Sequence, residues 1–359
     1  MNATQAVIDL DDTDGLLGAD REGLLRAASM AGAHVRSAAA AVDEGALDSL
    51  RDSDARPRTI IWVAGRGAAE TAGAMLAGMS GGSSPTPIVL AAEAPPWIGP
   101  LDVLIVAGDD PGDPALVGAA ASGVRRGARV VVAAPYEGTL RDTTAGRVAV
   151  MEPRLPVAVE FGLCRYLAVG LAVLGRVDPR LLVDLAALAD ELDAEALRNS
   201  ASREVFTNPA KALVERMSGR RVVLVGDCAA TLALARHGSA VLLRAANEVT
   251  AATGLADALT GLRTGPGPSF ADPSEALFHD EEIDGPLADR LRILVLILDA
   301  ERAVLASRVA GFDDVDLVGA EDVPDGGPTR PAVQRAEQQL AILAVRLEMA
   351  AVYLRLVRG

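Results

Sequence analysis

Apolar runs rich in β-branched residues alternate with helix-length segments through the first half of the chain, and this alternation restricts the possible folds more than any other feature. Strands are expected at 59–64, 87–90, 102–107, 129–134 and 147–150, and helices at 20–50, 68–79, 114–126 and 138–144. Strands that are apolar throughout and separated by helices are typical of a parallel sheet covered on both faces. The first half is therefore predicted to be an α/β unit.

The second half begins with helices and then repeats the alternation. Helices are expected at 158–174, 178–199, 208–219 and 229–237, strands at 221–225, 292–298 and 315–318, and one long final helix at 330–356. A strand followed directly by a glycine and a helix occurs at Gly65 and again at Gly226, which indicates a duplicated unit. With about 150 residues per domain as a guide, we predict two α/β domains, 1–200 and 201–359, joined by helices.

The charge balance limits the possible partners. Acidic residues outnumber basic ones by 49 to 34, which gives a formal net charge of −15, and Lys211 is the only lysine. A surface this acidic repels phosphate backbones, so no nucleic-acid partner is expected. Cys164 and Cys228 stand in apolar stretches and are expected to be small buried thiols, neither paired in a disulfide nor ligating a metal.

Membrane insertion and export are not expected either. The uncharged stretch 71–92 contains glycines and prolines that would break a spanning helix, and the acidic start of the chain is unlike a signal peptide. We therefore expect a cytoplasmic protein that needs no cofactor.

The turn after the first expected strand is a candidate anion site. In Gly65-Arg66-Gly67 the backbone N–H groups at the start of a helix, together with the Arg66 guanidinium, could face a negatively charged ligand. Glu70 stands where a dinucleotide-binding loop has its third glycine, so a dinucleotide is weakly supported. A tight turn without any ligand explains these residues equally well.

Three carboxylates follow the third expected strand, at Asp109, Asp110 and Asp113. They could cap the next helix, bind a cation or form a solvated turn. Capping is favoured, because Asp113 directly precedes Pro114 at an expected helix start.

Candidates for acid–base chemistry are few. Glu248 follows Asn247 near the end of an apolar-faced stretch, where a single glutamate is ordinarily a solvated helix residue. His34 is expected on an N-terminal helix, and His237 at a helix end, where a cation suits the helix dipole. His279 alone stands in a loop flanked by carboxylates, which makes it the better candidate for proton transfer.

The order of these segments resembles the bifunctional phosphoglucose/phosphomannose isomerase family, which is built from two sugar isomerase (SIS) domains, and in particular its divergent TobH-like members. The resemblance covers most of the chain from the first strand onward. Its most specific parts are Asn208-Pro209-Ala210-Lys211, Asn247-Glu248, the strand at 291–300 and the final residues 351–359. It implies two three-layer α/β/α domains with mainly parallel, flavodoxin-like sheets, long connecting and C-terminal helices, and a homodimer.

The resemblance also implies aldose–ketose isomerisation of glucose 6-phosphate or mannose 6-phosphate to fructose 6-phosphate. Glu248 matches the family's catalytic base, which would move a proton between C1 and C2 through a cis-enediol. His279, in Phe278-His279-Asp280-Glu281, matches the histidine that would assist ring opening. The residues that match or lie near the family's substrate-binding positions are Gly65, Arg66, Gly67, Asp109 and Arg154.

Departures from the family's pattern support an alternative, a catalytically silent protein that binds a carbohydrate derivative or serves in regulation. Ala69 replaces a serine of the first glycine loop, and the family's C-terminal lysine has no counterpart. Carboxylates replace the hydroxyl donors of the second phosphate loop at 107–112. Two like charges about 4 Å apart repel by about 4 kcal/mol at an effective dielectric of about 20. A metal-dependent enzyme that uses these carboxylates is a third, weaker possibility.

Overall fold

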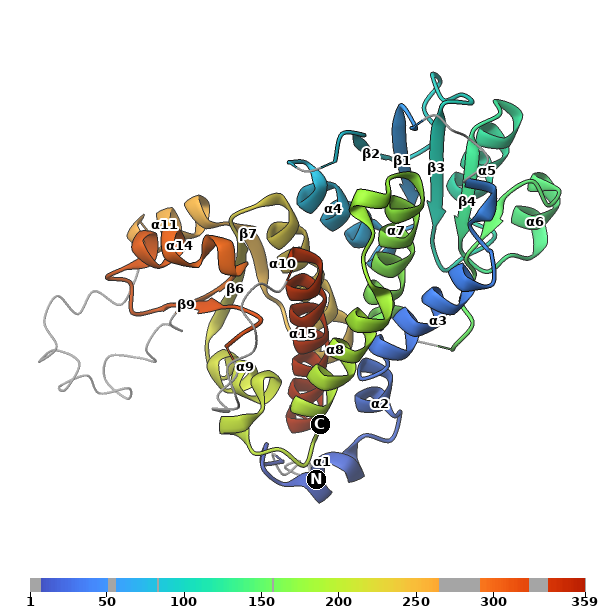
Figure 1. Ribbon diagram of the computed structural model, residues 1–359. Coiled ribbons are helices and arrows are strands. Elements are labelled where there is room, and N and C mark those ends of the chain that lie inside the picture. Colours follow the sequence, from blue (N-terminus) through green and yellow to red (C-terminus); the bar gives the residue numbers. More distant parts are fainter. Residues whose placement is uncertain are drawn as a thin grey trace, which may run out of the picture.

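The described part of the chain forms two parallel β-sheets with a layer of helices between them (Figure 1). The computed structural model describes residues 8–50, 56–82, 84–156, 158–264, 291–322 and 335–358. The strand orders are β2-β1-β3-β4-β5 in the first sheet and β7-β6-β8-β9 in the second. In each sheet, the strand that comes second in the sequence lies at the sheet edge, and the strand that comes first lies between it and the third. The two units therefore share one strand order. We call the parts around the two sheets the first lobe and the second lobe.

The first lobe follows the expected alternation closely. Its strands are β1 (Thr59–Ala64), β2 (Ile88–Ala91), β3 (Asp102–Ala107), β4 (Arg129–Ala133) and β5 (Ala149–Val150), and its helices are α4 (Ala68–Ser80), α5 (Pro114–Arg125) and α6 (Gly138–Thr144). Parallel register pairs Ala64 with Ala107, and Ala107 with Ala133. The loops after β1, β3 and β4 therefore leave the sheet at one edge, where ligands of open α/β sheets bind.

Both faces of the first sheet are buried, as predicted. Ile61 and Val63 belong to the apolar cluster that contains residues of α5 and α6. Ile60 and Trp62 point to the opposite face, where they join α4 and the central helices in a second cluster. Because successive side chains of a strand face opposite sides, a continuously apolar β1 is what this double burial requires.

The second lobe contains elements that the sequence did not reveal. Its strands are β6 (Arg221–Gly226), β7 (Ala251–Gly254), β8 (Leu291–Leu296) and β9 (Val315–Val318), and its helices are α10 (Ala229–Ala246), α11 (Leu255–Thr264) and α14 (Arg302–Val309). The helix expected at 229–237 is α10 and is twice as long. The strand β7 and the helix α11 follow it where no element was expected. The α/β prediction with a parallel sheet is nevertheless confirmed.

A layer of helices lies between the sheets and carries the two ends of the described chain (Figure 1). It consists of α1 (Thr13–Ala19), α2 (Leu24–Ala28), α3 (Ala31–Asp43), α7 (Leu163–Val177), α8 (Leu185–Arg198), α9 (Pro209–Met217) and α15 (Ala336–Arg358). The last helix, α15, is buried along most of its length and belongs to one continuous apolar cluster with α7 and α10. None of the described helices is both long and apolar enough to cross a bilayer.

Two expected helices are interrupted. A 3₁₀ turn (Val159–Phe161) precedes α7, and another (Pro179–Leu181) stands where the helix at 178–199 was expected to begin. The helix α8 starts only at Leu185, because Asp184 accepts hydrogen bonds from the amides of Ala186 and Ala187 and so caps it there. The division of the chain into domains 1–200 and 201–359 remains a prediction.

The lobes meet through one helix from each, α4 and α10. A Cβ at Gly78, near the end of α4, would lie 2.7 Å from the backbone nitrogen of Ala230 at the start of α10. At the other end, a Cβ at Gly67 would lie 3.3 Å from Nη1 of Arg244 in the last turn of α10. The two helices therefore run antiparallel, and the glycine turn of the first lobe lies against the end of α10.

Candidate functional site

The glycine turn after β1 leaves the start of α4 uncapped. The amide of Gly65 donates to the carbonyl of Ala107 at 2.7 Å, which holds the turn against β3. Gly67 has a φ of 84°, which only glycine adopts without strain, and no side chain in the described ranges caps the helix that follows. The first N–H groups of α4 therefore stay available to an anion. Arg66 on the surface and Arg244 of α10 supply positive charge nearby.

The start of α5 is built differently, because its own carboxylates occupy it. Asp113 accepts a hydrogen bond from the amide of Ala115 at 2.8 Å, which confirms the predicted N-cap. Asp110 accepts one from the amide of Gly112, also at 2.8 Å. A carboxylate of the chain thus takes the place that an external anion would need at this helix start.

Asp109, expected to bind substrate, is held by two side chains of α7. Its Oδ1 accepts hydrogen bonds from Nη2 of Arg165 at 3.0 Å and from the hydroxyl of Tyr166 at 2.6 Å. Arg165 is 5% exposed, and its guanidinium also stacks on the Tyr166 ring. A buried cation therefore compensates the charge of Asp109, which weakens the repulsion of a phosphate that was expected from the carboxylates of this loop. Whether Asp109 contacts a substrate stays a prediction.

His34 of α3 lies close to Arg165, and no local sequence pattern relates the two residues. Burial lowers the pKa of His34, and the nearby positive charge of Arg165 lowers it further. Among the residues that the structure describes, its Nε2 has no hydrogen-bond partner, nor have Nε and Nη1 of Arg165. His34 and Arg165 line a cavity of about 10 Å³, which is the space of a single water molecule.

Glu248, the expected catalytic base, lies just beyond the end of α10. Asn247 ends the helix with a φ of 51°, and the amide of Glu248 donates to the carbonyl of Leu242 at 3.1 Å. The interpretation of Glu248 as a solvated helix residue is therefore wrong. Its carboxylate is 18% exposed and forms an ion pair with Arg358 near the end of α15.

His237 is not at a helix end, as was expected, but in the interior of α10. Its Nε2 lies 2.9 Å from Oε1 of Glu348 on α15, and both side chains are 1% exposed. Burial raises the pKa of Glu348, and the contact with His237 opposes that rise in part. With neither group open to solvent, the pair holds α10 against α15.

The structure does not bring Arg154 or His279, the remaining predicted site residues, together with the glycine turn and Glu248. Arg154 is on the surface, where it makes two hydrogen bonds to the carboxylate of Glu44, at 2.9 and 2.6 Å. His279 lies outside the described residues. Within the described ranges, no group of three or more histidine, cysteine, aspartate or glutamate side chains could hold a metal ion. The structure thus places the turn 65–67 next to the loop 108–113 and the end of α10. The catalytic and substrate-binding roles of the residues in these segments stay predictions.

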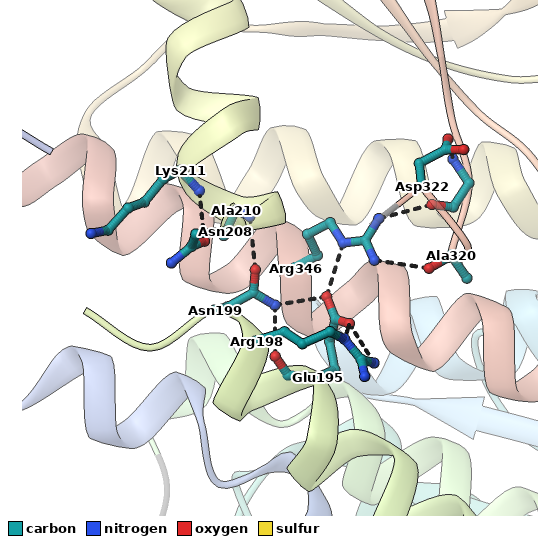
Figure 2. A network of polar contacts seen from close by, with 10 residues as sticks. Glu195, Arg198, Asn199, Asn208, Ala210, Lys211, Ala320, Asp322 and Arg346 are labelled. Atoms are coloured by element: carbon teal, nitrogen blue, oxygen red, sulfur yellow. Dashed lines mark hydrogen bonds and ion pairs between the residues drawn. The ribbon is translucent and has the colours of Figure 1, made fainter. Parts of the chain in front are cut away.

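Lys211 belongs to a structural network rather than to this site (Figure 2). Asn208 caps α9 by accepting from the Lys211 amide at 3.0 Å. The Lys211 ammonium donates to the carbonyls of Ala201 and Arg203 at 2.8 and 2.7 Å. Burial lowers the pKa of the ammonium, and acidic residues near the chain start oppose this. The motif 208–211 is therefore explained by its local structure.

The second part of this network is a buried ion pair between α8 and α15. Nε of Arg346 donates to Oε1 of Glu195 at 2.9 Å, and its Nη1 and Nη2 donate to the carbonyls of Gly319 and Ala320 at 2.8 and 3.0 Å (Figure 2). Burial alone would raise the pKa of Glu195, but Arg346, Arg198 and a hydrogen bond from a neighbouring asparagine bring it below its ordinary value. Arg346 thereby connects α8 to the loop after β9.

Comparison with known proteins supports the fold assignment. No protein-family model matches the sequence, and no curated protein matches it. Tagatose-6-phosphate ketose/aldose isomerase from Escherichia coli matches the structure with a TM-score of 0.60 at 14% identity, over 94% of this chain and 91% of that chain. A suggested phosphosugar isomerase from Bacillus subtilis matches with a TM-score of 0.59 at 14% identity, over 92% and 95%.

The C-terminal domain of glucosamine-fructose-6-phosphate aminotransferase from Francisella tularensis also matches, with a TM-score of 0.56 at 11% identity, over 96% of each chain. Identities this low show the fold and no more. The expectation of two SIS-type α/β units with parallel sheets and a long C-terminal helix is confirmed. Membership in the phosphoglucose/phosphomannose isomerase family remains a prediction.

Proposed function

We propose that this protein binds a phosphorylated hexose between its lobes and isomerises it, converting glucose 6-phosphate or mannose 6-phosphate to fructose 6-phosphate. One observation carries the proposal. Arg244 lies beside the uncapped glycine turn at Gly67 and stands four residues before Glu248. The candidate anion-binding turn of the first lobe and a carboxylate of the second lobe would therefore lie at the same end of α10.

The phosphate would bind at the start of α4 rather than at the start of α5. At α4 the amide groups are uncapped, and the charges of Arg66 and Arg244 favour an anion. At α5 the carboxylate of Asp113 already accepts from the amide of Ala115 and would repel a phosphate. This arrangement differs from the hydroxyl-lined second loop that the family resemblance leads one to expect.

The chemistry needs one carboxylate that can accept and return a proton. Glu248 would take the proton from C2 of the open-chain aldose and deliver it to C1, while a second proton passes from the C2 hydroxyl to the oxygen on C1, so that the reaction runs through a cis-enediol to the ketose. Arg358 contacts this carboxylate, so the substrate would have to displace Arg358 or bind beside it. His279 would assist ring opening.

Binding without catalysis is the second candidate function, and the same ion pair favours it. If Arg358 stays on Glu248, the carboxylate has no free path to a substrate proton. The protein would then recognise a sugar derivative without changing it.

A coupled assay with both hexose 6-phosphates tests these alternatives. We expect turnover by the unaltered protein and a loss of more than a hundredfold in kcat for Glu248→Gln, since general-base contributions are typically ~10²–10⁴. The exposed Glu215 on α9, which precedes the start of β6, provides the matched control, and Glu215→Gln should leave kcat unchanged. Absence of turnover with saturable substrate binding would favour the silent protein, and absence of both would refute the two proposals together.

A further inference from the structure

A cavity of about 510 Å³ lies between α1, α2, α8 and α15, apart from the residues assigned to the proposed reaction. In Figure 1, α1 and α2 lie near the C-terminal end of α15, and the contacts between these helices agree with that view. The volume falls within the range of about 300–1,000 Å³ that is common for small-molecule sites. The cavity is therefore large enough for a ligand of moderate size.

Apolar side chains form most of its wall. Leu25, Met349 and Tyr353 are at least 90% buried and form its floor, while Leu17 and Leu197 are 55% and 71% exposed at its mouth. Two large exposed leucines beside one cavity favour an apolar occupant, because an apolar group that covers them gains about 25 cal/mol per Å² removed from water.

The charges at the cavity are asymmetric. Asp193 contributes a carboxylate, but Arg36 forms an ion pair with it at 2.5 Å. Arg26 also lines the cavity, and its guanidinium makes no hydrogen bond or ion pair with any residue that the structure describes. The only uncompensated charge in the described wall is thus positive, which complements an anionic head group.

The floor is rigid enough to serve as a preformed site. The Tyr353 hydroxyl donates to the carbonyl of Asn199 at 2.6 Å, and the Lys211 ammonium lies 5.5 Å from the centre of its ring. The aromatic side chain is therefore held in place by Asn199 and Lys211, which both belong to the polar network drawn in Figure 2. A ligand that enters does not have to order this side chain.

From these features we infer that the cavity binds an anionic amphiphile, a molecule with an unbranched or aromatic apolar body and one carboxylate or sulfonate. The apolar body lies on Leu25, Met349 and Tyr353, and the head group pairs with Arg26 at the mouth. This ligand site does not depend on the proposed isomerase activity.

Calorimetric titration of the full chain with decanoate, below its micelle concentration, tests the inference. We expect one saturable site, with weaker binding of decan-1-ol and the weakest binding of decylammonium. Arg26→Gln should weaken decanoate binding about fivefold, as is typical for an exposed ion pair, and should leave decan-1-ol unaffected. Arg21, exposed on the same segment but outside the cavity wall, gives the matched control Arg21→Gln, with no change expected.

A second variant tests the apolar part. Leu197→Glu should weaken the binding of decan-1-ol through loss of apolar contact, and that of decanoate more strongly because the new carboxylate also repels its head group. The fold should survive because Leu197 is exposed. Val304→Glu, at an equally exposed position on α14, should change neither. The inference is overturned if decanoate does not saturate, if decylammonium binds as tightly, or if Arg26→Gln has no effect. It is also overturned if Leu197→Glu dissociates a dimer and no amphiphile binds, since the cavity would then be an interface between copies.

Discussion

Removing the Arg346 side chain should cost a large part of the stability of the fold, and the structure allows the cost to be worked out. Arg346→Met keeps the apolar stem but removes a guanidinium that is 2% exposed and makes three hydrogen bonds. The carboxylate of Glu195, which is fully buried, then keeps only Arg198 and one amide as partners. Removing one partner of a buried pair costs about 3–5 kcal/mol.

We therefore expect a loss of about 4 kcal/mol in the free energy of unfolding, against a typical total of about 5–15 kcal/mol. Urea denaturation measures it. Circular dichroism follows all the helices, whereas tryptophan fluorescence follows the first lobe, where Trp62 and Trp97, the only two tryptophans, both lie. Coincident transitions would show that the lobes unfold together.

Arg198→Met is the matched control for this measurement. Arg198 contacts the same carboxylate at 2.9 Å, but its side chain is 18% exposed, so water can replace it and the loss should be about 1 kcal/mol. A loss below about 1 kcal/mol for Arg346→Met, or equal losses for both variants, would refute the reasoning that burial sets the cost.

Two further predictions concern packing and pH. Gly226→Ala should destabilise the protein by about 1–3 kcal/mol in urea denaturation, because the new Cβ would lie 2.1 Å from the backbone nitrogen of Leu232. The control Gly118→Ala places a Cβ in open space at an exposed helix position and should be neutral or stabilising. Equal changes in stability for the two variants would contradict this explanation. The pKa of His34 is lowered from 6.5, so the unfolded chain binds the proton more readily, and stability should fall as pH drops below about 6.5 through the folded-state value. His34→Gln should flatten this dependence in denaturation curves measured between about pH 5 and 8, and an unchanged slope would show that His34 is not its source.

The first lobe could be predicted from the sequence because its signals are local. Each strand is a short apolar run, and Asp113 before Pro114 marks a helix start wherever the rest of the chain lies. The length of α10 could not be predicted in this way. The helix end expected at His237, directly before Gly238, lies inside α10. Glycine is needed at position 238 because a Cβ there would lie 2.8 Å from Cδ1 of Leu224 in β6. This glycine permits close helix–sheet packing, a requirement that only the folded structure reveals.

The candidate site was predicted only in part, for a similar reason. The glycine turn and Glu248 could be identified from short motifs, since each lies next to a recognisable element. The partner of Asp109 could not, because Arg165 stands 56 residues away and no local pattern relates the two. The charge of a loop therefore cannot be judged from its own residues when a buried cation from another helix compensates it.

The buried position of Lys211 makes its reaction with amine reagents a measure of local opening of the fold. It is the only lysine and is fully buried, with its ammonium on two backbone carbonyls at the joint between α8 and α9. An amine-reactive reagent can therefore modify this side chain only when the joint opens. The rate of modification at Lys211 would measure local opening of the helix layer between the lobes. The measurement reports on one defined atom, Nζ of Lys211, and needs no substitution in the chain.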